Sequence, residues 1–150
     1  MHDFCSYRGL LILTGVTKEG PNANAHVIRS TDGKAALWAG AIDDLWSLGK
    51  PVGYGGPWAG TSVQEGQPSD PYLMMGYDKK SISLSHQGKE AVRFTVQVDI
   101  TGMGDWVTYK TFNVKPGQTV EERFPAGYQA YWLRTVVDAA CEATAQLKYE

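Results

Sequence analysis

Five acidic residues lie where a carboxylate pair for sugar chemistry would be sought: Asp43, Asp44, Glu65, Asp70 and Asp78. Hydrolysis of a glycosidic bond needs two carboxyl groups that face each other across a cleft. Asp43 and Asp44 are adjacent, so a strand would point them to opposite faces. A helix cap with one solvated acid accounts better for this pair, and a turn accounts better for Asp70 in Pro-Ser-Asp-Pro. The acids therefore favour a non-enzymatic chain.

The histidines and cysteines show no metal-binding spacing. None of His2, His26 and His86 lies two or four residues from another, and Cys5 and Cys141 form no CxxC motif. We therefore expect neither a metal nor a cofactor, and we place His86 at the surface or in a turn. For the cysteines two interpretations stay open: two small buried thiols, or a disulfide that ties the first strand to the last in an oxidising compartment.

Residues 50–77 contain too many glycines and prolines for a helix or an interior strand, so we expect a long irregular loop. A sugar-binding site needs an exposed aromatic face, with polar groups nearby for the hydroxyls. Tyr54, Trp58 and Tyr72, together with Asp70, meet that need and are the predicted ligand-binding residues. The open alternative is that Trp58 folds back and plugs one end of the fold.

The N-terminal segment reads as a β-unit. An apolar run at 9–16 suits a buried strand, and turn-forming residues follow at 17–25. Asp-Gly between 26–29 and 35–40 predicts a hairpin of two further strands. Next, Asp43 or Asp44 would cap a single helical turn that ends at Gly49.

The C-terminal half predicts antiparallel strands separated by turn signals. In the clearest of them, Val92, Phe94, Val96, Val98 and Ile100 alternate with polar residues, as in a strand with one buried face. The expected strands are 81–86, 92–100, 106–114, 119–124, 130–137 and 141–149. We therefore predict an all-β chain, a jelly-roll-like antiparallel β-sandwich with at most one short helical turn. It is expected to be a single β domain over 1–150, divided into an N-terminal β-unit at 1–49, the loop at 50–77 and sandwich strands at 78–150.

Charge and hydropathy exclude two classes of partner. The net charge is −2 without a basic stripe, which argues against nucleic acid, and no apolar run approaches the length of a membrane span. The first residues do not have the form of a signal peptide.

Six stretches together resemble a known family: residues 29–34, 55–58, 68–73, 76–80, 132–134 and 141–145. They are similar to the C-terminal region of bacterial β-propeller, sialidase-like proteins associated with polysaccharide degradation. This resemblance implies a carbohydrate setting, so a secreted or periplasmic location in the native context is the expectation. Ser30, Asp32 and Gly33, with Trp38 beyond them, also resemble a degenerate Asp-box, a folding motif of propeller blades whose glycine here comes one residue early. Such relatives carry a long upstream portion, so an active site located there would be absent from this chain.

The resemblance implies a non-catalytic carbohydrate-interaction or accessory module of a polysaccharide-processing system. Two alternatives stay open. One is a polysaccharide-active enzyme, a glycoside hydrolase or lyase, with its site on 50–77. The other is a structural or oligomerisation domain that forms a homo-oligomer, with the aromatic residues of 50–77 covering a subunit interface.

Overall fold

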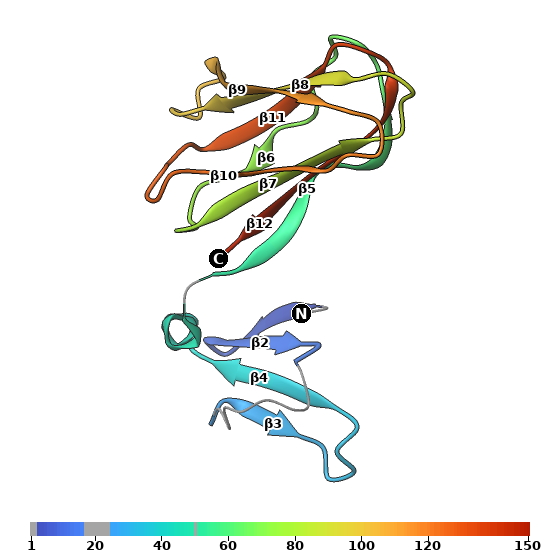
Figure 1. Cartoon of the computed structure of the whole chain (residues 1–150). Coiled ribbons are helices and arrows are strands. Elements are labelled where there is room, and N and C mark those ends of the chain that lie inside the picture. The colour runs from blue at the N-terminus through green and yellow to red at the C-terminus, as the bar shows by residue number, and fades with distance from the viewer. Residues whose placement is uncertain (1–2, 17–24, 50) are drawn as a thin grey trace. The chain divides into compact units, whose positions relative to one another are not determined.

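The computed structural model describes residues 3–16, 25–49 and 51–150, the side chain of Leu48 excepted. His2 and almost all of the expected loop at 17–25 lie outside the described residues. The chain divides into two compact units, Met1–Lys50 and Pro51–Glu150 (Figure 1). Within the described ranges, no helix has the length and apolar character needed to cross a bilayer.

The N-terminal unit is a four-stranded antiparallel sheet followed by one short 3-10 helix. The strands lie in the order β1-β2-β4-β3 and span Phe4–Tyr7 (β1), Leu10–Thr14 (β2), Val27–Arg29 (β3) and Ala36–Gly40 (β4). Asp32 holds the β3–β4 turn, because its carboxylate accepts hydrogen bonds from Ser30 Oγ at 2.6 Å and from the Lys34 N–H at 3.1 Å. Gly33 adopts a φ of 67°, which favours glycine. The predicted hairpin is therefore confirmed.

The helix η1 spans Ile42–Leu48, where the sequence predicts a single helical turn. Its N-cap residue is Ala41, so the prediction that Asp43 or Asp44 occupies the cap position is wrong. Asp44 lies in the first turn, and its Oδ2 accepts the Ala41 N–H at 2.7 Å. Gly49, with a φ of 92°, ends the helix, as predicted.

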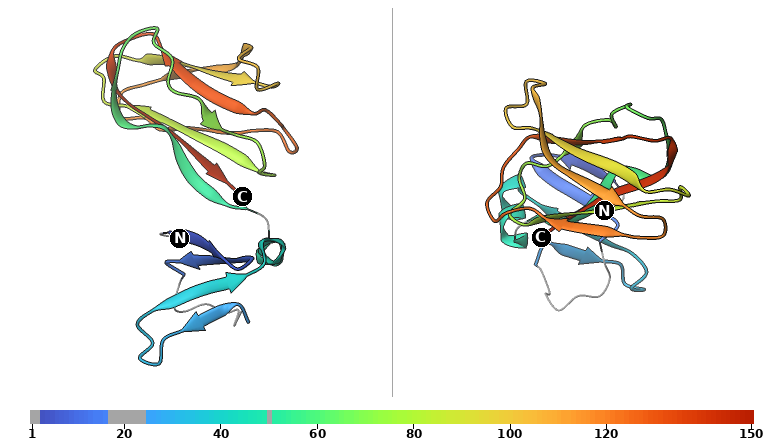
Figure 2. Two further views of the ribbon diagram at one scale, coloured as in Figure 1. Left: turned by 180° about the vertical axis from the view of Figure 1, so that it is seen from behind. Right: turned by 45° about the horizontal axis from the view of Figure 1, so that its top comes forward.

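The C-terminal unit is a sandwich of two four-stranded antiparallel sheets (Figure 2). The first sheet has the order β10-β7-β12-β5, and the second has the order β6-β11-β8-β9. The strands are β5 (Gly53–Val63), β6 (Tyr72–Leu73), β7 (Lys80–His86), β8 (Val92–Asp99), β9 (Trp106–Val114), β10 (Val120–Arg123), β11 (Trp132–Val137) and β12 (Cys141–Tyr149). The predicted all-β antiparallel sandwich with one short helical turn is confirmed.

The core between the sheets follows from the alternation along β8. Phe94, Val96 and Val98 are buried and pack with inward residues of the other sheet such as Leu84 and Leu147. Burial of each such side chain stabilises the fold by about 1.5–3 kcal/mol. The prediction for Ile100 is wrong, because β8 ends at Asp99 and the Ile100 side chain is exposed.

The prediction of an irregular loop over 50–77 is wrong in its first half, where β5 runs for 11 residues. β5 is an edge strand, so Pro57 can occupy it without removing a ladder hydrogen bond from an interior position. Two bulges accommodate the extra residues: Gly56 and Pro57 lie opposite Gln146 alone, and Ala59 and Gly60 lie opposite Thr144 alone.

Side chains of β12 complete the hydrogen bonding at these bulges. Gln146 Nε2 donates to the Trp58 carbonyl at 2.7 Å, and Thr144 Oγ1 accepts the Gly60 N–H at 3.0 Å. A Cβ at Gly56 would lie 2.0 Å from the Ala145 carbonyl oxygen. The glycine that predicted a loop is therefore required by the close approach of β12.

Candidate functional site

Two of the predicted ligand-binding residues lie on β5 but in opposite environments. The Tyr54 side chain is 75% exposed on the outer face of its sheet. Trp58 is 5% exposed and packs edge-to-face on Phe94, with ring centroids 6.4 Å apart. The indole of Trp58 therefore has no free face for stacking. Its ring packs into the sandwich, in line with the alternative expectation that Trp58 folds back into the fold.

The other two predicted residues lie further along the chain. Tyr72 is half-buried in β6, and its hydroxyl lies where a Cβ on Gly55 would be. Asp70 is exposed, and it lines a small hollow of about 200 Å³ that Trp58 also lines. Tyr54 lines a different, larger groove on the sandwich, which shares no lining residue with this hollow. Tyr54 and Asp70 therefore do not line the same hollow.

The two described histidines, His26 and His86, occupy structural positions. The prediction of His86 at the surface or in a turn is wrong: its ring is buried, with Nε2 2.9 Å from the Val114 carbonyl and Nδ1 accepting the Gly88 N–H at 3.0 Å. His26 packs on Trp38 with ring centroids 5.2 Å apart. Among the described residues, no group of three or more His, Cys, Asp or Glu side chains is arranged to hold a metal ion.

Both cysteines are free thiols, so the structure contains no bond between Cys5 and Cys141. Cys5 is exposed on β1, which overturns the buried-thiol interpretation for that residue. Cys141 is half-buried, and burial together with Asp138 raises the pKa of its thiol. The Cys141 thiol is therefore not activated as a nucleophile by a lowered pKa.

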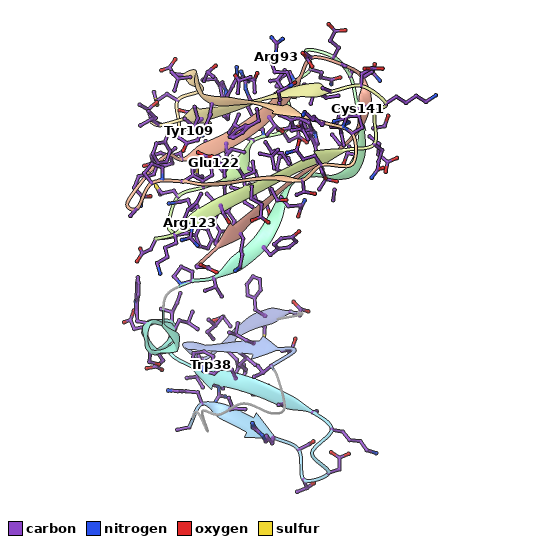
Figure 3. All side chains as sticks on the ribbon, viewed as in Figure 1. Trp38, Arg93, Tyr109, Glu122, Arg123 and Cys141 are labelled. Atoms are coloured by element: carbon purple, nitrogen blue, oxygen red, sulfur yellow. The ribbon has the colours of Figure 1, made fainter. Side chains whose placement is uncertain are left out.

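A groove of about 590 Å³ lies on the outer face of the β10-β7-β12-β5 sheet. Arg123, Ser81, Lys148 and Tyr54 are direct cross-strand neighbours and form one row over all four strands. The next row is formed by Glu121, Ser83 and Gln146. Figure 3 marks Arg123 on β10, at one end of the first row.

The sequence contains a signal for this groove that a search for aromatic loops misses. Within the strands 81–86, 119–124 and 141–149, the polar residues alternate with buried ones, so they share the outer face of one sheet. Which strands are neighbours is set by the topology, and the order β10-β7-β12-β5 is not readable from the alternation.

One residue that lines the groove already uses its charged group in hydrogen bonds within the protein. Lys80 is buried, and its ammonium donates to the Tyr77 carbonyl at 2.6 Å and to the Tyr128 carbonyl at 2.8 Å. Burial lowers its pKa, and Asp78 partly offsets that effect. Lys80 therefore links the strand β7 to the segments beside it and is not free to bind a ligand.

The N-terminal sheet carries apolar side chains on both faces. Paired residues share a face, so Phe4, Leu13, Trp38 and Val27 form one row across all four strands. Figure 3 marks Trp38 within this unit. The opposite face is also largely apolar, through Tyr7, Leu10, Ile12, Leu37, Ala39 and Ile28.

Much of this apolar surface is open. Phe4 is 68% exposed on one face and Ile28 is 57% exposed on the other. The face with Ile28 also has a hollow of about 630 Å³, lined by residues that include Thr14, Val16 and Leu37. In the helix that follows, Trp46 is 85% exposed.

Comparisons with known proteins do not identify a family. No family model matches the chain, and no curated protein matches it. Among solved structures, one chain from work on the disulfide-linked pili of Bacillus endospore appendages is similar, with 13% sequence identity and a TM-score of 0.40. The match covers 67% of this chain and 89% of that chain. A likeness of this size defines neither a fold family nor a function.

Proposed function

We propose that this chain is a non-catalytic structural module that assembles with further copies of itself through the sheet formed by β1, β2, β4 and β3. One observation carries the proposal: both faces of that sheet are apolar and substantially exposed. Antiparallel sheets that face water normally do so with one polar face. A sheet that is apolar on both sides needs a covering layer on both sides.

The strands of this sheet are too short and too open to stabilise it alone. They have three to five residues each. Among the described residues of this unit, Trp38 is the one large hydrophobic residue that is buried. Full burial of an exposed side chain such as Phe4 or Ile28 would stabilise an assembly by about 1.5–3 kcal/mol each. Two such residues on opposite faces therefore give self-association a substantial driving force.

Two further features favour a copy of this chain as the covering partner. Trp46 presents a large exposed ring, and the hollow beside Ile28 is open and lined mainly by apolar groups. Two different apolar faces on one unit allow head-to-tail association, in which one face of a copy meets the other face of the next. The sandwich of residues 51–150 has its own core and needs no such cover.

Light scattering with the variants Phe4→Ser and Ile28→Ser, in reducing buffer so that Cys5 cannot link two chains, tests the proposal. The native chain should grow in mass with concentration, and each variant should shift that growth to higher concentration. Met103→Ser is the matched control, because Met103 is 82% exposed in the turn after β8 and should leave association unchanged. A strict monomer at high concentration overturns self-association and directs attention to a different covering partner.

Glycan recognition, as in a secreted or periplasmic accessory module of a polysaccharide-processing system, is a second candidate function. The specific observation in its favour is Tyr54, whose exposed ring lies in the first row of the groove on the sandwich. An exposed aromatic ring next to hydrogen-bonding side chains is what sugar binding requires. The predicted stacking surface thus moves from Trp58 to Tyr54. An enzyme acting on polysaccharide has no comparable support, because the Asp44 carboxylate already accepts the Ala41 N–H within the helix η1.

A further inference from the structure

We propose that the outer face of the β10-β7-β12-β5 sheet binds an uncharged oligosaccharide, with Tyr54 as the stacking platform. The inference rests on the second candidate function, whose ligand class it specifies, and it is independent of self-association by the N-terminal sheet.

The groove has a floor of small side chains and walls of long ones. Ser81 and Ser83 lie on β7, in the interior of the sheet. On one side Arg123 and Glu121 extend from β10, and on the other Lys148 and Gln146 extend from β12. The volume of about 590 Å³ lies within the range of small-molecule sites.

The polar groups of the groove suit hydroxyls better than ions. A hydroxyl both donates and accepts hydrogen bonds, and the lining offers donors in Arg123 and acceptors in Glu121, with serine hydroxyls that do both. An anionic ligand would be attracted by Arg123 but repelled by Glu121, which lies on the same strand and the same face.

Several of the charges that line the groove are already paired. Lys148 bonds to Glu150, whose carboxylate also interacts electrostatically with Arg123 and Lys79. The Lys80 ammonium is held by backbone carbonyls. Pairing of this kind reduces the net field in the groove for a ligand of either sign. The charge pattern therefore selects for an uncharged, hydroxyl-rich ligand.

The backbone at Tyr54 is held in a defined position at the open end of the row. It pairs directly with Lys148, and the bulge that follows it is fixed by the hydrogen bond from Gln146 to the Trp58 carbonyl. A tyrosine side chain has only two χ angles, so it provides a large stacking surface at a small cost in conformational entropy. β5 thus supplies the platform, and β7, β10 and β12 supply the polar contacts.

Affinity electrophoresis and titration calorimetry of the full chain, with a soluble neutral glucan, a neutral mannan and an anionic polyuronate, test the inference. At least one neutral polysaccharide should bind, and Tyr54→Ala should weaken it about tenfold or more. Ser83→Arg, which fills the floor without removing the platform, should also abolish or strongly weaken binding. Tyr131→Ala is the control, because this exposed tyrosine does not line the groove.

The outcomes separate this inference from the function on which it rests. Binding of the polyuronate alone would overturn the assignment of an uncharged ligand while leaving glycan recognition in place. Binding of no polysaccharide would overturn both. Neutral binding that survives both Tyr54→Ala and Ser83→Arg would place the glycan site elsewhere and overturn the groove assignment.

Discussion

The hydroxyl of Tyr72 lies against the backbone of Gly55, so close that a Cβ on Gly55 would be 2.1 Å from the Tyr72 oxygen. Tyr72 comes from β6 of one sheet and Gly55 from β5 of the other. This contact joins the two sheets at the edge where β5 lies. It also explains why a glycine occurs in the middle of a strand, where it is otherwise unfavourable.

Gly55→Ala should lower the free energy of unfolding by about 1–3 kcal/mol, because the added methyl group overlaps the Tyr72 hydroxyl. Urea unfolding measures this effect. Gly53→Ala is the matched control on the same strand, since its Cβ would meet the Tyr149 ring at 3.4 Å, which is ordinary contact. Tyr72→Phe in the Gly55→Ala background should recover part of the lost stability. If Gly55→Ala loses no more stability than Gly53→Ala, the result contradicts the contact.

Stability should decrease as the pH rises above about 10, the ordinary pKa of tyrosine. Burial raises the pKa of Tyr109, Tyr128 and Tyr149, so these phenols keep their protons in the folded state after the unfolded chain has released them. The folded state then binds more protons, and the free energy of unfolding falls with pH. Lys80, whose pKa is lowered, acts in the opposite direction below its ordinary value of 10.5 but is a single group.

Urea unfolding between pH 8 and pH 11.5 measures this slope. Tyr149→Phe should make the slope shallower, although it also removes the hydrogen bond to the Leu73 carbonyl and so lowers stability at neutral pH. Tyr131→Phe, at an exposed ring, should leave the slope as it is. An identical slope in the native chain and in Tyr149→Phe would show that Tyr149 does not contribute to the alkaline loss.

Asp99 should contribute to the loss of stability in acid. Burial opposes its ionisation, but the backbone N–H groups of Gly104, Gly102 and Thr101 outweigh burial and hold the pKa of Asp99 below its ordinary value of 3.8. Such a carboxylate contributes stability above its unfolded pKa, and the contribution is lost as the pH falls through the folded value. Asp99→Asn should therefore unfold more easily at pH 7 and depend less on pH below about 4.

Thermal unfolding at pH 7 and at pH 2.5 tests this statement. Glu65→Gln is the control, since it changes an exposed carboxylate in the turn after β5. Equal losses of melting temperature at both pH values for Asp99→Asn would indicate that the side chain fills space at the turn without a role for its charge.

The sequence predicts the strands well because their alternation is local. Phe94, Val96 and Val98 define β8 without any knowledge of their neighbours. β5 escapes prediction because its glycines and Pro57 are explained only by their surroundings: the edge position, the bulges opposite Gln146 and Thr144, and the Tyr72 hydroxyl. Propensity at these positions is overruled by tertiary contacts.

The exposure of the candidate site residues also depends on contacts that the sequence pattern does not reveal. That Tyr54 and Trp58 have opposite exposures depends on the one bulge between them, at Gly56 and Pro57, since a strand without irregularity would place residues four apart on the same face. His86 reads as a surface residue because the partner of its Nε2, the Val114 carbonyl, lies 28 residues further along the chain. Neither outcome follows from composition or spacing.

Hydrogen–deuterium exchange as a function of protein concentration tests the central claim most directly. If copies of the chain cover the N-terminal sheet, amides of β2 and β4 should become more protected as the concentration rises, while those of β8 and β11 in the sandwich stay constant. The change should be smaller in Phe4→Ser and in Ile28→Ser. Protection of β2 and β4 that does not vary with concentration, in a chain whose mass stays that of a monomer, would contradict the claim.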